Sequence, residues 1–126
     1  MARFLWICLG GAIGTGARYL LSGWLARTHP AFPWGTLAVN LIGSFLIAVI
    51  LQASFTTESI SPTLRLFLTT GIMGGFTTYS TFNYETLNAF QEGNNWAGVL
   101  NLSATVIGCL AAGILGLWSG RLLAGR

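Results

Sequence analysis

The sequence has no lysine and no aspartate, and its charge rests on six arginines and three glutamates. Only 7% of the residues are charged while 53% are hydrophobic, and the mean hydropathy is +0.68. So few charges do not suit the surface of a domain packed in water. No run of cations follows the chain as a nucleic-acid partner would require. The composition therefore indicates a protein of the lipid bilayer and excludes a nucleic-acid partner.

Residues that bind metals or carry out catalysis are also scarce. Cys8 and Cys109 lie in apolar stretches without a CxxC spacing, so we expect no disulfide, zinc or redox site and interpret both as small core residues. His29 stands beside Pro30 and has no neighbouring ligand for a metal. A nucleophile, a base and an orienting group do not occur in combination. The sequence therefore predicts a protein that is not an enzyme.

What the sequence has in quantity is long apolar stretches. A helix needs about 20 residues to cross about 30 Å of hydrocarbon. Four stretches are long enough, and they cover residues 4–26, 34–55, 64–90 and 96–122. The five tryptophans lie near the ends of these stretches, where an indole prefers the membrane interface. We predict an all-α, multi-pass protein of the cell inner membrane or plasma membrane, with one four-helix transmembrane domain over residues 1–126.

The third stretch contains an unusual segment, GIMGGFTTYSTF at residues 71–82. Paired glycines followed by paired threonines are poor helix formers, so we expect local unwinding over residues 74–78. Unwound backbone is tolerated in a bilayer only where it is buried in protein or lines a wet cavity. The segment therefore predicts a third helix broken in mid-membrane. Its purpose is either an ion site, or a kink or close helix crossing.

Small residues recur at helical spacing in the first and fourth stretches. Gly10 and Gly14 lie in the first stretch. The fourth has Ala104, Gly108, Ala112, Gly116 and Gly120. Small residues in register let helix backbones approach closely in lipid, so this pattern predicts tight packing. Four tightly packed helices leave little room for a hydrophilic path, and we therefore expect a homo-oligomer.

Two charged residues lie within the predicted helices. Arg18 would cost at least about 2.5 kcal/mol near the centre of a membrane. It therefore extends to the interface at Ala26, pairs with carbonyl oxygens at a helix C-terminus, or attracts an anion into a vestibule. Glu85 lies about two helical turns beyond the predicted break. It is either a vestibule residue or a buried partner for Arg18.

Two lines of polar residues have helical spacing. Asn40 shares a helix face with Thr36 and Ser44. The fourth stretch supplies Asn101, Thr105 and Cys109. Each line is either a seam of interhelical hydrogen bonds or the lining of a path for an anion, since amides and hydroxyls donate hydrogen bonds without carrying a full charge. Tyr79 and Phe82 share a face after the break. They either pack or present positive ring edges to an anion.

At these residues the sequence resembles the Fluc (CrcB) family of fluoride channels. The resemblance rests on GARY at residues 16–19, GTLAVNLIG at 35–43 and GGFTTYSTF at 74–82, and it extends over all four predicted helices. It implies four-helix subunits that form antiparallel, dual-topology homodimers with two pores. It also implies passive electrodiffusion of fluoride, and a structural sodium ion held by backbone carbonyls at the two facing helix breaks.

The resemblance further implies roles for individual residues. The sodium ligands would be the carbonyls of Gly74 and Thr77. The pore residues would be Asn40, Tyr79, Phe82, Ser80, Thr81, Asn101 and Thr105. At the position of Tyr79 the family usually has phenylalanine.

Two other functions are compatible with a small membrane protein. A proton-coupled transporter of the small multidrug-resistance type is also a four-helix, dual-topology dimer, but such proteins resemble one another in a membrane-embedded glutamate on the first helix. This chain has Arg18 there and no acid. A purely structural membrane subunit would leave the broken helix and both polar lines without a purpose.

Overall fold

The computed structural model describes residues 1–56 and 60–123, and in this part of the chain it contains helices and no strand. The elements in chain order are α1 (Ala2–Thr28), α2 (Trp34–Thr56), α3 (Pro62–Leu66), the π-helical segment η1 (Phe67–Met73), α4 (Gly74–Phe76), α5 (Tyr79–Gln91) and α6 (Asn95–Leu123). The all-α prediction is confirmed for the described residues.

Three of these helices, α1, α2 and α6, are long and apolar enough to cross a membrane. They correspond to the predicted stretches 4–26, 34–55 and 96–122. The remaining stretch, 64–90, is formed by α3, η1, α4 and α5 in series, and its longest element has 13 residues. The structure therefore has three uninterrupted candidate spans and one interrupted series of shorter helical segments.

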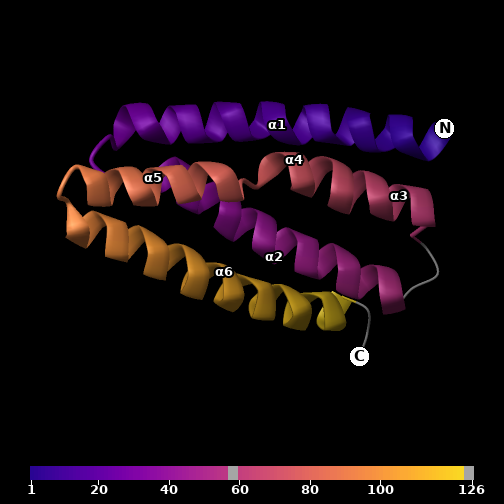
Figure 1. The fold of residues 1–126 in the computed structure, drawn as a ribbon. Coiled ribbons are helices and arrows are strands. Elements are labelled where there is room, and N and C mark those ends of the chain that lie inside the picture. Colours follow the sequence, from indigo (N-terminus) through magenta and orange to yellow (C-terminus); the bar gives the residue numbers. More distant parts are fainter. Residues whose placement is uncertain (57–59, 124–126) are drawn as a thin grey trace.

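The elements form a bundle in which α1 and α6 lie on opposite sides of the interrupted series. Figure 1 shows α1 running along α3, α4 and α5, with α6 beside α5 at one end and beside α2 at the other. The most extensive packing is between α2 and α6, followed by that between α1 and η1. The first residue of α1 and the last residues of α6 lie toward the same end of the bundle (Figure 1).

Glycines bring α1 into backbone contact with the interrupted series. A Cβ atom added at Gly14 would overlap the Ile72 carbonyl oxygen, and one added at Gly75 would lie 2.5 Å from the carbonyl oxygen of Gly11. At Gly10 an added Cβ would lie 2.7 Å from the Phe67 carbonyl oxygen. The close helix crossing predicted from Gly10 and Gly14 is therefore present, with the backbone of the third stretch as its other side.

The small residues of α6 face α2 in a similar way. A Cβ added at Gly116 would overlap the Phe45 carbonyl oxygen, and one at Gly120 would lie 2.7 Å from the Cβ of Gln52. Both glycines are buried. The expectation of tight packing on the fourth stretch is confirmed at these two positions.

The break itself is narrower than the sequence predicts. Gly74 has helical dihedral angles, φ −62° and ψ −38°, and α4 continues through Phe76. Only Thr77 (φ −85°, ψ 158°) and Thr78 (φ −151°, ψ 111°) are extended. The expectation of unwinding over residues 74–78 is therefore wrong for the glycines. They remain helical, because Gly75 is held against α1 and the backbone leaves the helix only beyond Phe76.

The expectation that both cysteines are core residues is wrong for Cys8, which is exposed on α1. Cys109 on α6 is partly exposed. In a bilayer the outer face of a helix is as apolar as its packed face, so an apolar sequence context does not mark a residue as buried.

Candidate functional site

A side chain from α2 holds Thr78, the second extended residue of the break. Asn40, on α2, donates its Nδ2 to the Thr78 carbonyl oxygen at 3.0 Å and accepts the Thr78 N–H on its Oδ1 at 2.8 Å. Both residues are buried. Buried backbone groups must be hydrogen-bonded, and here a side-chain amide takes the place of the helical partners that Thr78 lacks. Asn40 is therefore the residue that fixes the extended backbone at this point.

Thr78 also begins α5. Its Oγ1 accepts the Thr81 N–H at 3.3 Å, which is the hydrogen bond of a helix N-cap, and lies 2.9 Å from the Thr81 hydroxyl. The Ser80 hydroxyl lies 3.4 Å away. The sequence analysis did not assign a role to Thr78. Threonine is a preferred N-cap residue, and its place directly before a helical stretch is the signal that could have identified it.

Two carbonyl groups lose their helical donors at the break. The N–H of Thr78 bonds to Asn40 rather than to the Gly74 carbonyl, and the N–H of Thr81 bonds to Thr78 rather than to the Thr77 carbonyl. The Thr77 carbonyl instead accepts from Nη1 of Arg18 at 3.4 Å. Of the alternatives open for Arg18, the structure has pairing with a C-terminal carbonyl, since Thr77 is the C-cap of α4.

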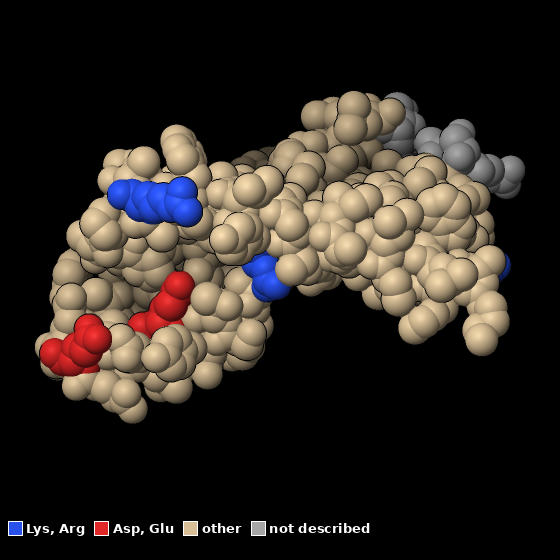
Figure 2. All heavy atoms as spheres, turned by 90° about the horizontal axis from the view of Figure 1, so that it is seen from above, with Lys and Arg blue, Asp and Glu red and all other residues tan. Residues whose placement is uncertain are grey.

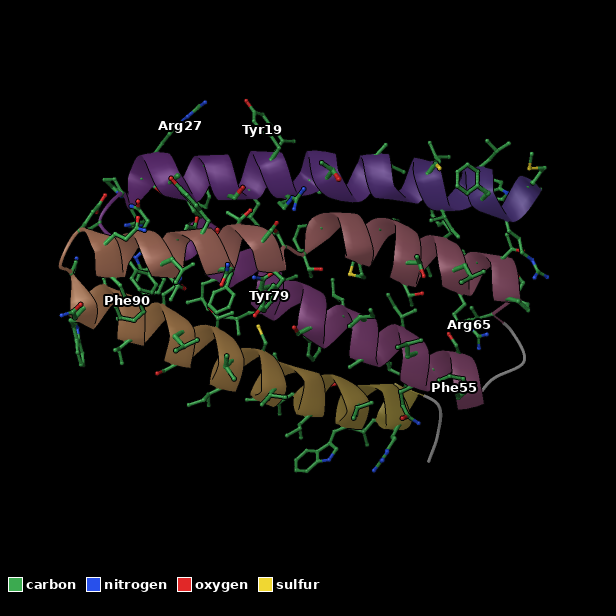
Figure 3. All side chains as sticks on the ribbon, viewed as in Figure 1. Tyr19, Arg27, Phe55, Arg65, Tyr79 and Phe90 are labelled. Carbon is green, nitrogen blue, oxygen red and sulfur yellow. The ribbon has the colours of Figure 1, made fainter. Side chains whose placement is uncertain are left out.

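A cavity of about 530 Å³ lies against the break. It brings together six of the predicted site residues, namely Asn40, Gly74, Thr77, Tyr79, Phe82 and Thr105. The rings of Tyr79 and Phe82 are 5.6 Å apart at 63°, an edge-to-face contact. Phe82 is buried whereas Tyr79 is 78% exposed, and Figure 3 shows Tyr79 extending from the start of α5 toward α6. The cavity thus joins a polar break to a pair of aromatic rings.

Arg18 and Glu85 form no ion pair in the structure. Arg18 contacts Thr77, while Glu85 accepts a hydrogen bond from the Thr36 hydroxyl at 2.8 Å on its Oε1. The interpretation of Glu85 as a partner for Arg18 is therefore wrong. The two charged side chains line different cavities, Arg18 one of about 210 Å³ and Glu85 one of about 560 Å³, and each bonds to another partner.

The larger of these two cavities lies at the end of the molecule where α1 connects to α2 and α5 to α6. Glu85 and Glu92 both line it, and Figure 2 shows the acidic side chains close together at this end. Arg27 points away from the bundle, as Figure 3 shows. Glu85 Oε2 is buried without a hydrogen-bond partner among the described residues. This cavity is therefore lined by carboxylates at an end of the bundle.

The polar residues of α6 lie apart from Ser80 and Thr81. Asn101 is fully buried and donates its Nδ2 to the Thr86 hydroxyl at 2.9 Å, and Thr86 in turn donates to the Phe82 carbonyl at 2.8 Å. Ser80 and Thr81 are exposed. These four hydroxyl and amide residues, which the resemblance places in the pore, are thus divided between a buried seam and an exposed helix start.

The seam on α6 is incompletely satisfied. Asn101 Oδ1 and Thr105 Oγ1 are buried without a hydrogen-bond partner among the described residues. Such groups cost about 1–3 kcal/mol each, so they indicate a position where another molecule or ion supplies the missing partner. Thr105 also lines the cavity at the break, which connects the two regions.

Comparison with known proteins places the chain in a family. A family model described as CrcB-like protein, Camphor Resistance (CrcB), matches residues 5–117. The chain belongs to the CrcB family. The match spans α1 to α6 and includes every candidate residue from Arg18 to Thr105.

CrcB relatives match the chain over nearly its whole length. A protein of Anaeromyxobacter dehalogenans named fluoride-specific ion channel FluC is 56% identical over 99% of this chain and 100% of its own length. Proteins of the same name are 54% identical in Sorangium cellulosum, over 99% of this chain and all of theirs, and 49% identical in Geobacter sulfurreducens, over 95% and 94%. These CrcB proteins are named as channels, which transport ions and are not enzymes. The predicted family and its non-enzymatic character are therefore confirmed.

Proposed function

We propose that this protein is a fluoride-selective channel, acting as a single four-helix transmembrane domain in the cell inner membrane or plasma membrane. The observation that carries this proposal is the cavity at the break, where neutral hydrogen-bond donors and aromatic ring edges meet. CrcB relatives named as fluoride-specific channels support the choice of ion. The alternative, a proton-coupled multidrug transporter, is disfavoured because α1 carries Arg18 and no acid.

We assign the side-chain amide of Asn40 as the hydrogen-bond donor to fluoride at the break. An amide nitrogen has two hydrogens, and the bond to the Thr78 carbonyl uses only one of them. The second is available to an anion, and the bonds to Thr78 fix its direction. A neutral donor of this kind lets an anion shed water without binding it so strongly that it fails to leave.

Phe82 and Tyr79 are the aromatic residues of the proposed path. The ring of Phe82 is 4% exposed and meets Tyr79 in an edge-to-face contact, which orients both rings. Aromatic rings have a positive edge, so an edge directed at the path attracts a small anion. From there the ion passes the hydroxyls of Ser80 and Thr81 or the unpaired groups of Asn101 and Thr105. Passive electrodiffusion needs no further chemistry.

A second copy of the chain completes the path in this proposal. Gly74 and Tyr79 at the break are exposed in the single chain, and lipid contact at an interrupted backbone is unfavourable. An isologous pair of chains buries the same surface of each copy. We propose that the two copies are antiparallel, so that the breaks face each other at mid-membrane and two pores form.

The carbonyl oxygens of Gly74 and Thr77 fit a structural sodium ion in kind. They are neutral, hard oxygen donors that have lost their helical partners, and two chains together would supply four of them. Arg18 already donates to the Thr77 oxygen at 3.4 Å, but a carbonyl oxygen has a second lone pair for another ligand. When bound, sodium would link the two copies. It takes no part in moving fluoride.

Arg18 and Glu85 are vestibule residues in this proposal. Arg18 is part-buried beside a cavity lined by threonine and serine hydroxyls, which suits the attraction of an anion from water. Glu85 is held by Thr36 beside the larger cavity. Its carboxylate opposes anions, so it would limit how strongly the vestibule retains them.

Ion efflux from liposomes containing the purified protein tests the proposal. We expect fluoride to leave rapidly and chloride to leave no faster than from protein-free liposomes. A parallel preparation in which a large organic cation replaces sodium throughout tests the structural ion, and we expect it to lose activity and dimer stability. Equal fluoride and chloride efflux would contradict the channel assignment, and full activity without sodium would contradict the sodium site.

A further inference from the structure

Two buried oxygen atoms on neighbouring turns of α6 have no partner among the described residues. Asn101 is 1% exposed and Thr105 is 7% exposed, yet Asn101 Oδ1 and Thr105 Oγ1 form no hydrogen bond in this part of the chain. The two residues are four apart in one helix, so their side chains lie on the same face with Cβ atoms about 5–6 Å from each other. Both oxygens therefore border one buried position beside α6.

The hydrogen bonds of the seam fix the direction of the Asn101 amide. The Thr86 hydroxyl has a single hydrogen and donates it to the Phe82 carbonyl at 2.8 Å. Toward Asn101 this hydroxyl can therefore only accept, so the amide atom 2.9 Å from it is the nitrogen, Nδ2. The amide oxygen Oδ1 is left as an acceptor. The seam thus ends in a buried oxygen that needs a hydrogen-bond donor.

An acceptor of this kind selects the molecule that can occupy the position. Fluoride has no hydrogen to donate, and its charge is repelled by the partial negative charge of the amide oxygen. A cation would meet two neutral oxygens, on Asn101 and Thr105, and an unbalanced charge is costly in a buried place. Water is neutral, and buried waters typically make about three hydrogen bonds to polar groups that otherwise lack partners. The two oxygens therefore favour water.

Water can reach this position from the cavity at the break. Thr105 lines that cavity of about 530 Å³. Two hydrogen bonds of about 2.8 Å through one water span the separation of polar groups one turn apart on a helix. We propose that one water molecule is held between Asn101 and Thr105, where it donates to the amide oxygen of Asn101 and accepts from the Thr105 hydroxyl.

The effect of this water on fluoride rests on the proposed function. One hydrogen of the water goes to Asn101, and the second is free for an anion in the cavity that Thr105 lines. The water thereby presents a donor to the ion at a place where the protein itself presents an acceptor. Fluoride that passes this part of the seam therefore contacts the water and not the amide oxygen of Asn101.

Two crystal structures of the full-length protein, at a resolution that shows ordered water, test the site independently of transport. One crystal is grown with fluoride and the other from a preparation that never contained it. We expect an ordered oxygen within about 3.2 Å of both Asn101 Oδ1 and Thr105 Oγ1 in both crystals, because the occupant is water. Density that disappears without fluoride would show that the position binds the anion. Density absent from both crystals would show that no water is held. Either result would overturn the proposal.

Thermal unfolding in detergent without fluoride tests the shared water by a second route. Thr105→Val removes the hydroxyl and keeps a similar shape. We expect it to lower the unfolding midpoint by about 4 °C in the parent and to have no effect in the Asn101→Leu background, where the water has already lost its acceptor. The matched control is Thr69→Val, because the buried Thr69 hydroxyl bonds to the Arg65 carbonyl one turn earlier in the chain. This control should lower the midpoint equally in both backgrounds.

An equal effect of Thr105→Val in both backgrounds would mean that the two side chains share no water. If Asn101→Leu does not fold, the crystals of the parent protein decide.

Fluoride efflux from liposomes then tests the role of the water in the path. Thr105→Val and Asn101→Leu should each slow efflux about tenfold, and the double variant should be no slower, because either change removes the same water. Thr105→Ser keeps the hydroxyl and should retain efflux. If the two effects multiply, each residue acts on the ion separately and the role of the water is wrong. If the parent protein does not conduct fluoride, the proposed function fails while the crystals still decide whether the water is bound.

Discussion

The interrupted series packs in two different ways on the two sides of its break. Before the break, η1 and α4 contact α1 backbone to backbone. The contacts are made at glycines, where the backbones are too close for a side chain to fit. After the break, α5 meets α2 and α6 through side-chain hydrogen bonds, such as those from Thr36 to Glu85 and from Asn101 to Thr86. The first region is held by close backbone packing, and the second by hydrogen bonds between side chains.

This difference separates the residues that stabilise the bundle from the residues that we assign to ion binding. The glycine crossing consists mainly of backbone contacts, with one long hydrogen bond from the Thr15 hydroxyl to the Gly75 carbonyl at 3.5 Å, so it stabilises the bundle chiefly by close packing. The polar region keeps buried groups, on Glu85, Asn101 and Thr105, that have no hydrogen-bond partner among the described residues and that an ion or water can satisfy. Substitutions in the first region should therefore change stability most, and substitutions in the second should change conduction most.

The largest effect is expected from Gly14→Ala. The new Cβ would overlap the Ile72 carbonyl oxygen and lie 2.9 Å from the Phe76 nitrogen, so α1 must move away from the interrupted series. We expect a loss of about 3 kcal/mol or more, seen as a lower midpoint of thermal unfolding in detergent. Gly16→Ala is the matched control on the same helix, because an added Cβ there meets no atom within 4 Å. If the Gly14→Ala protein is as stable as this control, the tight crossing does not stabilise the bundle.

Asn40→Ala should reduce both stability and conduction, since Asn40 holds the break between the two regions. It removes the hydrogen bonds to the N–H and carbonyl of Thr78, and we expect a loss of about 2 kcal/mol or more because unpaired buried groups cost about 1–3 kcal/mol each. Fluoride efflux should fall more than tenfold, about 1.4 kcal/mol in barrier height. Asn83→Ala, an exposed amide on α5, is the control. Equal efflux in the two variants would mean that the Asn40 amide does not serve the ion.

Phe82→Ile should affect conduction and spare the fold. Isoleucine fills much of the same buried space but has no ring edge, so stability should change by about 1 kcal/mol while most fluoride efflux is lost. The control is Phe90→Ile, because Phe90 packs between α5 and α6 against Gly98 and lines none of the path. Normal efflux in Phe82→Ile would return Phe82 to a packing role.

The smallest effect is expected from Tyr79→Phe. The hydroxyl of Tyr79 has no hydrogen-bond partner among the described residues, and its ring contacts Phe82. Removing the hydroxyl should leave fluoride efflux as fast as in the parent or faster, because a donor on the ring would slow the exit of the ion. Tyr79→Leu should be strongly impaired. The reverse order, with leucine active and phenylalanine inactive, would exclude a role for the ring.

Length and composition were enough to predict the helical class and the approximate extents of the long helices. The same sequence did not predict the exact break, because Gly75, one of the two glycines that favour unwinding, stays helical in close contact with α1. What ends the helix is a hydrogen bond from Thr78 to Asn40, 38 residues earlier in the chain. Propensity describes a residue and its neighbours, and so it does not contain this contact.

The site residues show the same limit. Helical spacing correctly grouped Asn40 with Thr36, since both are buried and bond to the segment from Thr78 to Glu85. Spacing did not reveal that Arg18 reaches the Thr77 carbonyl instead of Glu85, nor that Asn101 bonds to Thr86. These are contacts between helices, and their geometry depends on how closely the glycines let the helices approach.

The paired hydrogen bonds between Asn40 and Thr78 reproduce, with one side chain, the exchange of donor and acceptor found between neighbouring β-strands. The amide of Asn40 acts as a one-residue strand on which the two extended threonines are docked. A helix interrupted by two extended residues would ordinarily be free to bend at the interruption. With both hydrogen bonds to Asn40 in place, the interruption is held rigidly. Any change in the angle between α4 and α5 must first break both bonds, in a buried position where little water can replace them. In the proposed channel, the wall of the ion path beside Asn40 and Thr78 is therefore held in place by the fold itself.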